Sequence, residues 1–163
     1  MYIIYQASRG EMSHFNLTTP FKAAMFSLMG FAAACISFWT AYIGFLFFSD
    51  KVADIPAGYL WGIRLGILIF FIFSLQGFAM GARLSHTVGA ADGSEGIPLV
   101  NWSKKYGDLR IAHFMGMHAL QVLPLLSFYA VRNVKMVFVM SIVYGLSTLW
   151  VFIQALQGKP LVK

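Results

Sequence analysis

The stretch "KAAMFSLMGFAAACISFWTAYIGFLFF" (22–48) decides the fold class of this chain. After its first lysine it contains no charged residue, and it is longer than the roughly 20 apolar residues that a helix needs to cross a bilayer. Backbone groups in lipid must pair within their own segment, so such a run predicts a helix rather than a strand. Further apolar runs follow at 58–82, 109–129 and 134–156. The sequence therefore predicts an all-α integral membrane protein, built as a four-helix bundle.

The composition agrees with this fold class and excludes others. Hydrophobic residues make up 59% of the chain and charged residues 11%, with a mean hydropathy of +0.72. A soluble domain carries roughly 25% charged residues. The formal net charge is +6, but the basic residues flank the apolar runs and form no basic stripe interleaved with aromatics, so nucleic acid is not an expected partner. The expected surroundings are the lipid bilayer.

The spans are joined unequally, within a single transmembrane domain that covers 1–163. The links "SDKVADIPA" and "AVRN" are short and predict antiparallel helical hairpins, whereas 83–108, "RLSHTVGAADGSEGIPLVNWSKKYGD", is a long Gly-rich loop. Loops of this length are uncommon unless they are functional or disordered. The N-terminal "MYIIY" is too short to span and lacks the features of a signal peptide.

The distribution of basic residues predicts the orientation. With four spans, the N-terminus, the long loop and the C-terminus share one side of the membrane. That side holds Arg9, Lys22, Arg83, Lys104, Lys105, Arg110, Lys159 and Lys163, and the other holds Lys51, Arg64, Arg132 and Lys135. The excess predicts that the first side is cytoplasmic, with N-in and C-in topology, in the inner membrane of a bacterium.

The same topology brings the four histidines to one end of the bundle. His14 precedes the first span, His86 follows the second, and His113 and His118 lie in the first turns of the third. His118 is roughly 13 Å deeper than the start of its span. Ionisable side chains at such depth are costly and usually face the bundle interior, so they indicate a functional site. Gln121 follows His118 at i+3, on nearly the same face.

The spacing of the histidines limits their chemistry. Residues five apart on a helix differ by about 140° in direction, so His113 and His118 do not form an i, i+4 chelating pair. One of them could still combine with His14 or His86. Imidazole is an axial ligand of b-type haem and a ligand of transition metals. The expected supporting residues are Asp92, Trp102, Asp108, Arg110 and Gln121.

Three elements together resemble a family of uncharacterised bacterial multi-span membrane proteins. They are "SHFN", "SHTVGAADGSEGIPLVNWS" and "GDLRIAHFMGMHALQVLPLL", and they cover about 9–126. By this resemblance the family's positions here are His14, Asn16, His86, Asp92, Gly93, Pro98, Trp102, Gly107, Asp108, Arg110, His113, Gly116, His118 and Gln121. Similar proteins usually carry further spans before "SHFN", which implies a short homologue or a truncated start. The resemblance implies no reaction.

Three functions remain open on the sequence. The first is a membrane redox protein that binds b-type haem or a transition metal through His14, His86, His113 and His118. The second is a metal-free enzyme, in which His and Asp would perform acid–base catalysis on a lipid-like substrate in a groove near Arg110. The third is a non-catalytic accessory or structural subunit, whose polar end docks to other membrane subunits or to further copies of the chain.

Overall fold

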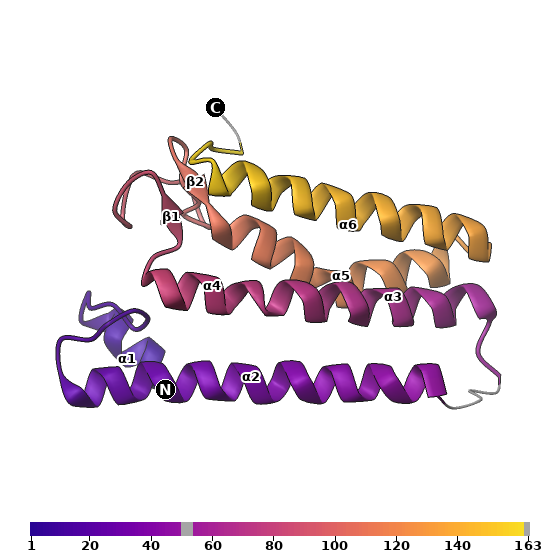
Figure 1. Ribbon diagram of the computed structural model, residues 1–163, viewed down its shortest axis with the longest axis horizontal. Helices are drawn as coiled ribbons and strands as arrows, with labels where there is room; N and C mark the ends of the chain where they lie inside the picture. The colour runs from indigo at the N-terminus through magenta and orange to yellow at the C-terminus, as the bar shows by residue number, and fades with distance from the viewer. Residues whose placement is uncertain (50–53, 162–163) are drawn as a thin grey trace.

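A computed structural model describes residues 1–49 and 54–161 of the chain (Figure 1). The elements, in chain order, are α1 (Tyr2–Ser8), α2 (Pro20–Ser49), α3 (Ala57–Ser74), α4 (Gln76–Arg83), β1 (Thr87–Val88), β2 (Gly107–Asp108), α5 (Leu109–Tyr129) and α6 (Val134–Leu156). The predicted loop positions Lys51 and Lys163 lie outside the described residues.

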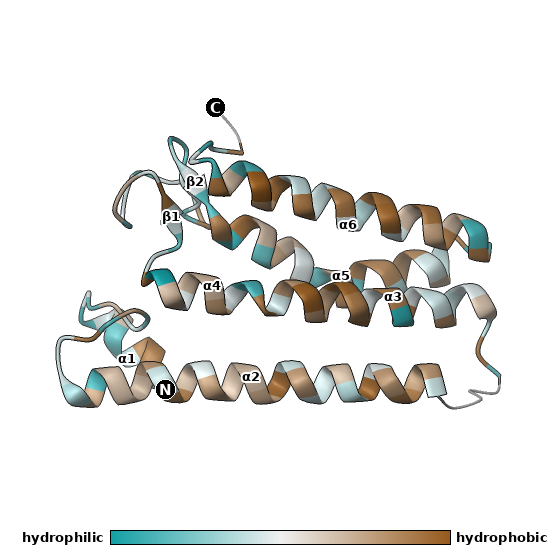
Figure 2. Cartoon of the chain, viewed as in Figure 1, coloured by the Kyte–Doolittle hydropathy of each residue, from teal (hydrophilic) through white to brown (hydrophobic). Residues whose placement is uncertain are grey.

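Four segments are long and apolar enough to cross a membrane: Pro20–Ser49, Ala57–Arg83, Leu109–Tyr129 and Val134–Leu156. They confirm the predicted all-α fold class. Apolar residues dominate these segments, and polar residues gather near β1 and β2 at one end (Figure 2). The protein is thus a polytopic membrane protein.

The helices α3 and α5 form the tightest contact of the bundle. Gly58, Gly62 and Gly66 lie one turn apart on α3, and a Cβ built on Gly62 would lie only 1.9 Å from Ser127 Oγ and 3.0 Å from the Leu123 carbonyl oxygen. Small residues at this spacing allow the backbones of membrane helices to approach closely. The glycines therefore determine how α5 sits on α3.

In contrast, α2 packs mainly against α3, and mostly near its own C-terminal end. A Cβ on Gly44 would lie 2.6 Å from Ile67 Cγ2. Arg64 of α3 donates a hydrogen bond to the Phe47 carbonyl at 2.8 Å, and its guanidinium lies 5.2 Å from the ring centroid of Phe48. These contacts hold one end of α2, whereas most of its surface is exposed.

The second span is interrupted at Leu75, which separates α3 from α4. Just after the break, the buried Gln76 donates its amide hydrogen to the Leu109 carbonyl at 2.8 Å. The Leu109 amide donates in turn to the His86 carbonyl at 2.9 Å. The first residue of α5 is therefore bound both to α4 and to the loop.

The long loop is ordered over the end of the bundle. Its strands β1 and β2 pair in an antiparallel register, with Thr87 opposite Asp108 and Val88 opposite Gly107. Gly107 lies so close to α6 that a Cβ would be 2.0 Å from the Ala155 carbonyl oxygen. Asp108 is the N-cap of α5, where its side chain accepts a hydrogen bond from the Arg110 amide. The loop thereby fixes the N-terminal end of α5, next to the candidate site.

Candidate functional site

A cavity of about 990 Å³ lies between α2, α4, α5 and the long loop. Its deeper wall is largely apolar and includes Phe26, Met29, Ile36, Phe78 and Met117. Polar side chains line it nearer the loop: Ser13, His14, His86, Thr87, Asp92, Ser94, Asn101, Ser103 and Arg110. The cavity is large enough for a drug-sized or cofactor-sized ligand, and its amphipathic lining suits a molecule with an apolar body and a polar edge.

His113 is the histidine of α5 that lines this cavity. Its Nδ1 lies 2.9 Å from the Phe73 carbonyl oxygen, at the end of α3. Because a carbonyl only accepts hydrogen bonds, Nδ1 carries the proton in the neutral ring, and the lone pair is on Nε2. The ring edge rests against Gly77, where a Cβ would lie 3.2 Å from His113 Cε1. The break after α3 and the missing side chain at Gly77 together fix the orientation of the imidazole.

His86 sits between two carboxylates in the loop. Its Nδ1 lies 3.4 Å from Asp92 Oδ1 and 3.8 Å from Asp108 Oδ1. Asp108 is held in turn by Arg110, through Nη2–Oδ2 at 2.7 Å and Nε–Oδ1 at 3.0 Å. The acceptors around Nδ1 favour a proton there, so that Nε2 of His86 also carries a lone pair when the ring is neutral.

Backbone and hydroxyl groups of the loop hold the Asp92 carboxylate. It accepts hydrogen bonds from the Ser85 hydroxyl at 2.8 Å and from the amides of Thr87 at 2.9 Å and His86 at 3.2 Å. Such a carboxylate joins the two sides of a turn, which is the usual role of Asp in tight loops. Asp92 therefore stabilises the conformation in which His86 faces both acids.

The environment of the loop shifts the pKa values of these groups in one direction. Burial lowers the pKa of His86 below its ordinary 6.5, and the charge of Arg110 adds to this effect, against the opposing influence of the two carboxylates. Burial would raise the pKa of Asp92 and of Asp108, but their hydrogen bonds outweigh it and hold both pKa values below 3.8. At neutral pH the imidazole is accordingly neutral and both acids are ionised.

The N-terminal segment supplies the third histidine of the cavity. His14 lines it, with Nδ1 2.9 Å from the Ser13 hydroxyl. The next residue, Phe15, stacks edge-on with Phe26 of α2 at 5.5 Å between ring centroids, and lies 6.5 Å from the His86 ring. The buried Asn16 closes this turn by donating to the Met12 carbonyl at 2.9 Å. Phe15 thus connects α2 with the loop at the polar end of the cavity.

His118 and Gln121 do not share this location. Both are exposed on α5, and neither lines the cavity. The structure thus differs from the expectation that His118 faces the bundle interior, because Gly116, Ala119 and Leu123 take the face against α3. His118 Nδ1 lies 2.8 Å from the Phe114 carbonyl oxygen, one turn earlier.

Some of the remaining predicted residues lie at the cavity and one lies outside it. Arg110 and Asp92 line the cavity, and Asp108 positions Arg110 from a fully buried side chain. Trp102 packs against Phe114, with ring centroids 5.4 Å apart, and lies outside the cavity. Some of the residues predicted from the sequence thus lie at the polar end of the cavity, and the others lie beside it.

Two features of the site were missed on the sequence. One is the Phe73 carbonyl that orients His113, because the break at Leu75 has no Gly or Pro at that position to signal it. The other is the set of small residues along the cavity: Gly30, Ala33, Ser37, Ser74, Gly77 and Gly81. Their spacing of three or four residues along each helix is a readable signal for a face with little side-chain volume.

Across residues 1–49 and 54–161, no group of three or more His, Cys, Asp and Glu side chains is arranged to hold a metal ion. The three cavity histidines come from three separate segments. Comparisons with protein-family models, with curated proteins and with solved structures gave no match.

Proposed function

We propose that the protein binds b-type haem in the cavity, with His113 Nε2 as an axial ligand, and acts as a membrane redox protein. The observation that carries this proposal is the hydrogen bond between His113 Nδ1 and the Phe73 carbonyl. Histidine ligands usually donate their second ring N–H to a carbonyl or a carboxylate, which fixes the tautomer and the ring direction.

The rest of the lining supports a haem. Apolar and small side chains from α2 and α4 leave room for a flat ring with an apolar body. His86 and His14 line the same cavity and are the candidates for a second axial position. Bound haem would supply reversible one-electron transfer between ferric and ferrous iron. By the positive-inside count, the polar end of the site would face the cytoplasm.

The test is haem reconstitution of the detergent-purified protein, followed by absorption spectra in the oxidised and reduced states. We expect a Soret band with one haem per chain, and its loss or a clear shift in His113→Ala. The matched control is His118→Ala, a histidine of the same helix outside the cavity, which should retain the band. A wild-type protein that binds no haem, or equal spectra for wild type and His113→Ala, would contradict the proposal.

The alternative proposal is a non-catalytic accessory subunit. It is supported by the exposed polar side chains of α5, His118 and Gln121, in the middle of a candidate span. This function predicts that the protein stays colourless after reconstitution and co-purifies with other membrane subunits in stoichiometric amounts. The spectra above therefore distinguish the two functions.

A further inference from the structure

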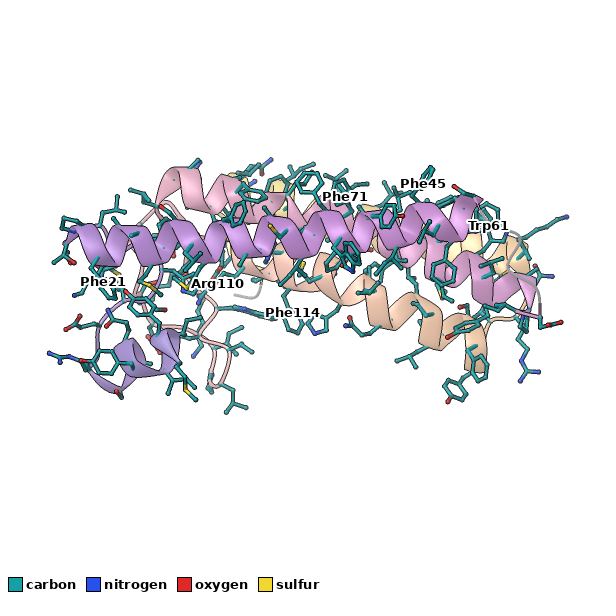
Figure 3. All side chains as sticks on the ribbon, turned by 90° about the horizontal axis from the view of Figure 1, so that it is seen from below. Phe21, Phe45, Trp61, Phe71, Arg110 and Phe114 are labelled. Atoms are coloured by element: carbon teal, nitrogen blue, oxygen red, sulfur yellow. The ribbon has the colours of Figure 1, made fainter. Side chains whose placement is uncertain are left out.

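An exposed stripe runs along α5, beside the cavity but separate from it. It consists of Phe114, His118, Gln121, Leu125 and Phe128, and each of them is exposed. The steps between successive members are four, three, four and three residues. This alternation is the heptad pattern of a helix that packs along another helix with a left-handed crossing. Phe114 lies at the margin of the bundle beside α5 (Figure 3).

The opposite face of α5 has a similar spacing and is packed against another helix. It carries the buried residues Gly116, Ala119, Leu123 and Ser127, which follow a similar spacing. This face packs on α3, where Gly62 and Gly66 approach the α5 backbone. The exposed stripe thus has the periodicity of a helix–helix contact. At its ends Phe114 packs against Trp102 of the loop and Phe128 against Tyr59 of α3, with ring centroids 5.4 and 5.1 Å apart. Its middle, from His118 to Leu125, remains exposed at His118, Gln121 and Leu125.

The two polar members of the stripe lie at a depth where lipid is a poor surrounding. His118 and Gln121 are roughly 13 and 18 Å from the start of α5, a helix that rises about 30 Å in all. Within the described part of the chain, the Gln121 side chain makes no hydrogen bond, and that of His118 makes one, through Nδ1 to the Phe114 carbonyl. Amide and imidazole groups left exposed at this depth favour association with another helix.

We propose that this stripe is a dimer interface, in which α5 packs against α5 of a second copy of the chain. Two copies in one membrane share their orientation, so a two-fold axis along the membrane normal sets the two helices parallel. The polar pair is complementary to itself under this symmetry. His118 Nε2 is an acceptor because Nδ1 is the donor to Phe114, and Gln121 carries the amide donor.

Each copy therefore donates one hydrogen bond from Gln121 to His118 of the other copy, and the symmetry makes two. The apolar members Leu125 and Phe128 meet their counterparts toward the C-terminal end of α5, where they exclude lipid. A polar pair within an otherwise apolar seam also fixes the register of the two helices. The interface does not depend on what occupies the cavity, so it holds whether or not haem binds.

The first test is disulfide cross-linking in liposomes at low protein density. The native Cys35 is exposed on α2, so the background is Cys35→Ala. We expect Leu125→Cys to form covalent dimers on mild oxidation, because the two-fold axis brings this position next to its counterpart. The matched control is Val139→Cys on α6, which has a similar exposed fraction, 53% against 55% for Leu125, and should remain monomeric. Equal cross-linking at both positions would overturn the proposal.

The second test measures association by energy transfer between labelled copies in the same liposomes. Removal of both symmetric hydrogen bonds by Gln121→Leu should weaken dimerisation about ten-fold. The control Leu146→Val alters an apolar residue of α6 that is 60% exposed and should leave association unchanged. A monomeric wild type in both tests would overturn the proposal.

Discussion

Small residues serve opposite purposes in two regions of this bundle. Between α3 and α5, Gly62 brings the helices so close that a Cβ would lie 1.9 Å from a neighbouring atom. Between α2 and α4, Gly30 has nothing within 4 Å of a built Cβ, and Gly81 has only Phe26 Cζ, at 3.9 Å. The same residue type thus removes space in one region and preserves it in the other. Whether a small residue gives a tight contact or free space depends on whether a second helix approaches that face.

The largest expected effect comes from filling the tight contact. Gly62→Leu places a side chain where Ser127 and the Leu123 carbonyl already lie, so α3 and α5 must separate. Overpacking of this kind should lower the free energy of unfolding by about 3 kcal/mol. Titration with a denaturing detergent, followed by circular dichroism, measures the change. A stability close to that of the wild type would mean that the two helices do not pack this closely.

The intermediate effect comes from the same substitution in the open region. Gly30→Leu adds a side chain to a cavity wall with free space, so its free energy of unfolding should change by no more than about 0.5 kcal/mol. Haem binding in the reconstitution assay should nevertheless fall at least about ten-fold, since the new side chain occupies the ligand's volume. The control is Phe31→Leu on the exposed side of α2. Unchanged haem binding by Gly30→Leu would place any haem elsewhere.

The smallest effect concerns pH and the loop that covers the cavity. The pKa of His86 is lowered by burial and by Arg110, so the folded loop prefers the neutral ring. The contribution of His86 to the stability of the folded loop is fully present above the pKa of the unfolded state, about 6.5. This contribution is lost as the pH falls through the lower pKa of the folded state. Asp92 and Asp108 stay ionised over this range, because their pKa values are lowered from 3.8.

Hydrogen exchange of the Leu109 amide, which donates to the His86 carbonyl, reports this opening. After correction for intrinsic exchange, we expect protection to decrease as the pH falls below about 6.5, toward the lowered pKa of His86. His86→Asn removes the titrating ring, and protection at Leu109 should then be nearly independent of pH in this range. A pH dependence that persists in His86→Asn would show that another group controls the loop.

The spans could be predicted closely because their limits are local. The side chains of Asp108 and Asn133 cap α5 and α6 by accepting hydrogen bonds from backbone amides in the first turn of each helix. Both helices begin where the apolar runs begin. The gathering of histidines at one end followed from topology alone, and three of the four line one cavity.

The rotation of α5 could not be predicted, because it depends on which face meets α3. Gly116 takes that face, where a Cβ would lie 2.0 Å from Phe73 Cβ, and this turns His113 toward the cavity and His118 away from it. The cavity itself was also beyond local reasoning. It exists because α2 is held near its C-terminal end, through Gly44 and Arg64, and not along its whole length.

The hydrogen bonds at Leu109 connect α4, α5 and the loop at the polar end of the protein. One fully buried residue receives the Gln76 amide on its carbonyl and gives its own amide to the His86 carbonyl. Leu109 therefore connects α4 and the loop at a second point, in addition to the chain itself, which runs from Arg83 into the loop. A ligand that pushed α4 outward would pull on the start of α5 and on the loop together, because both are bonded at Leu109.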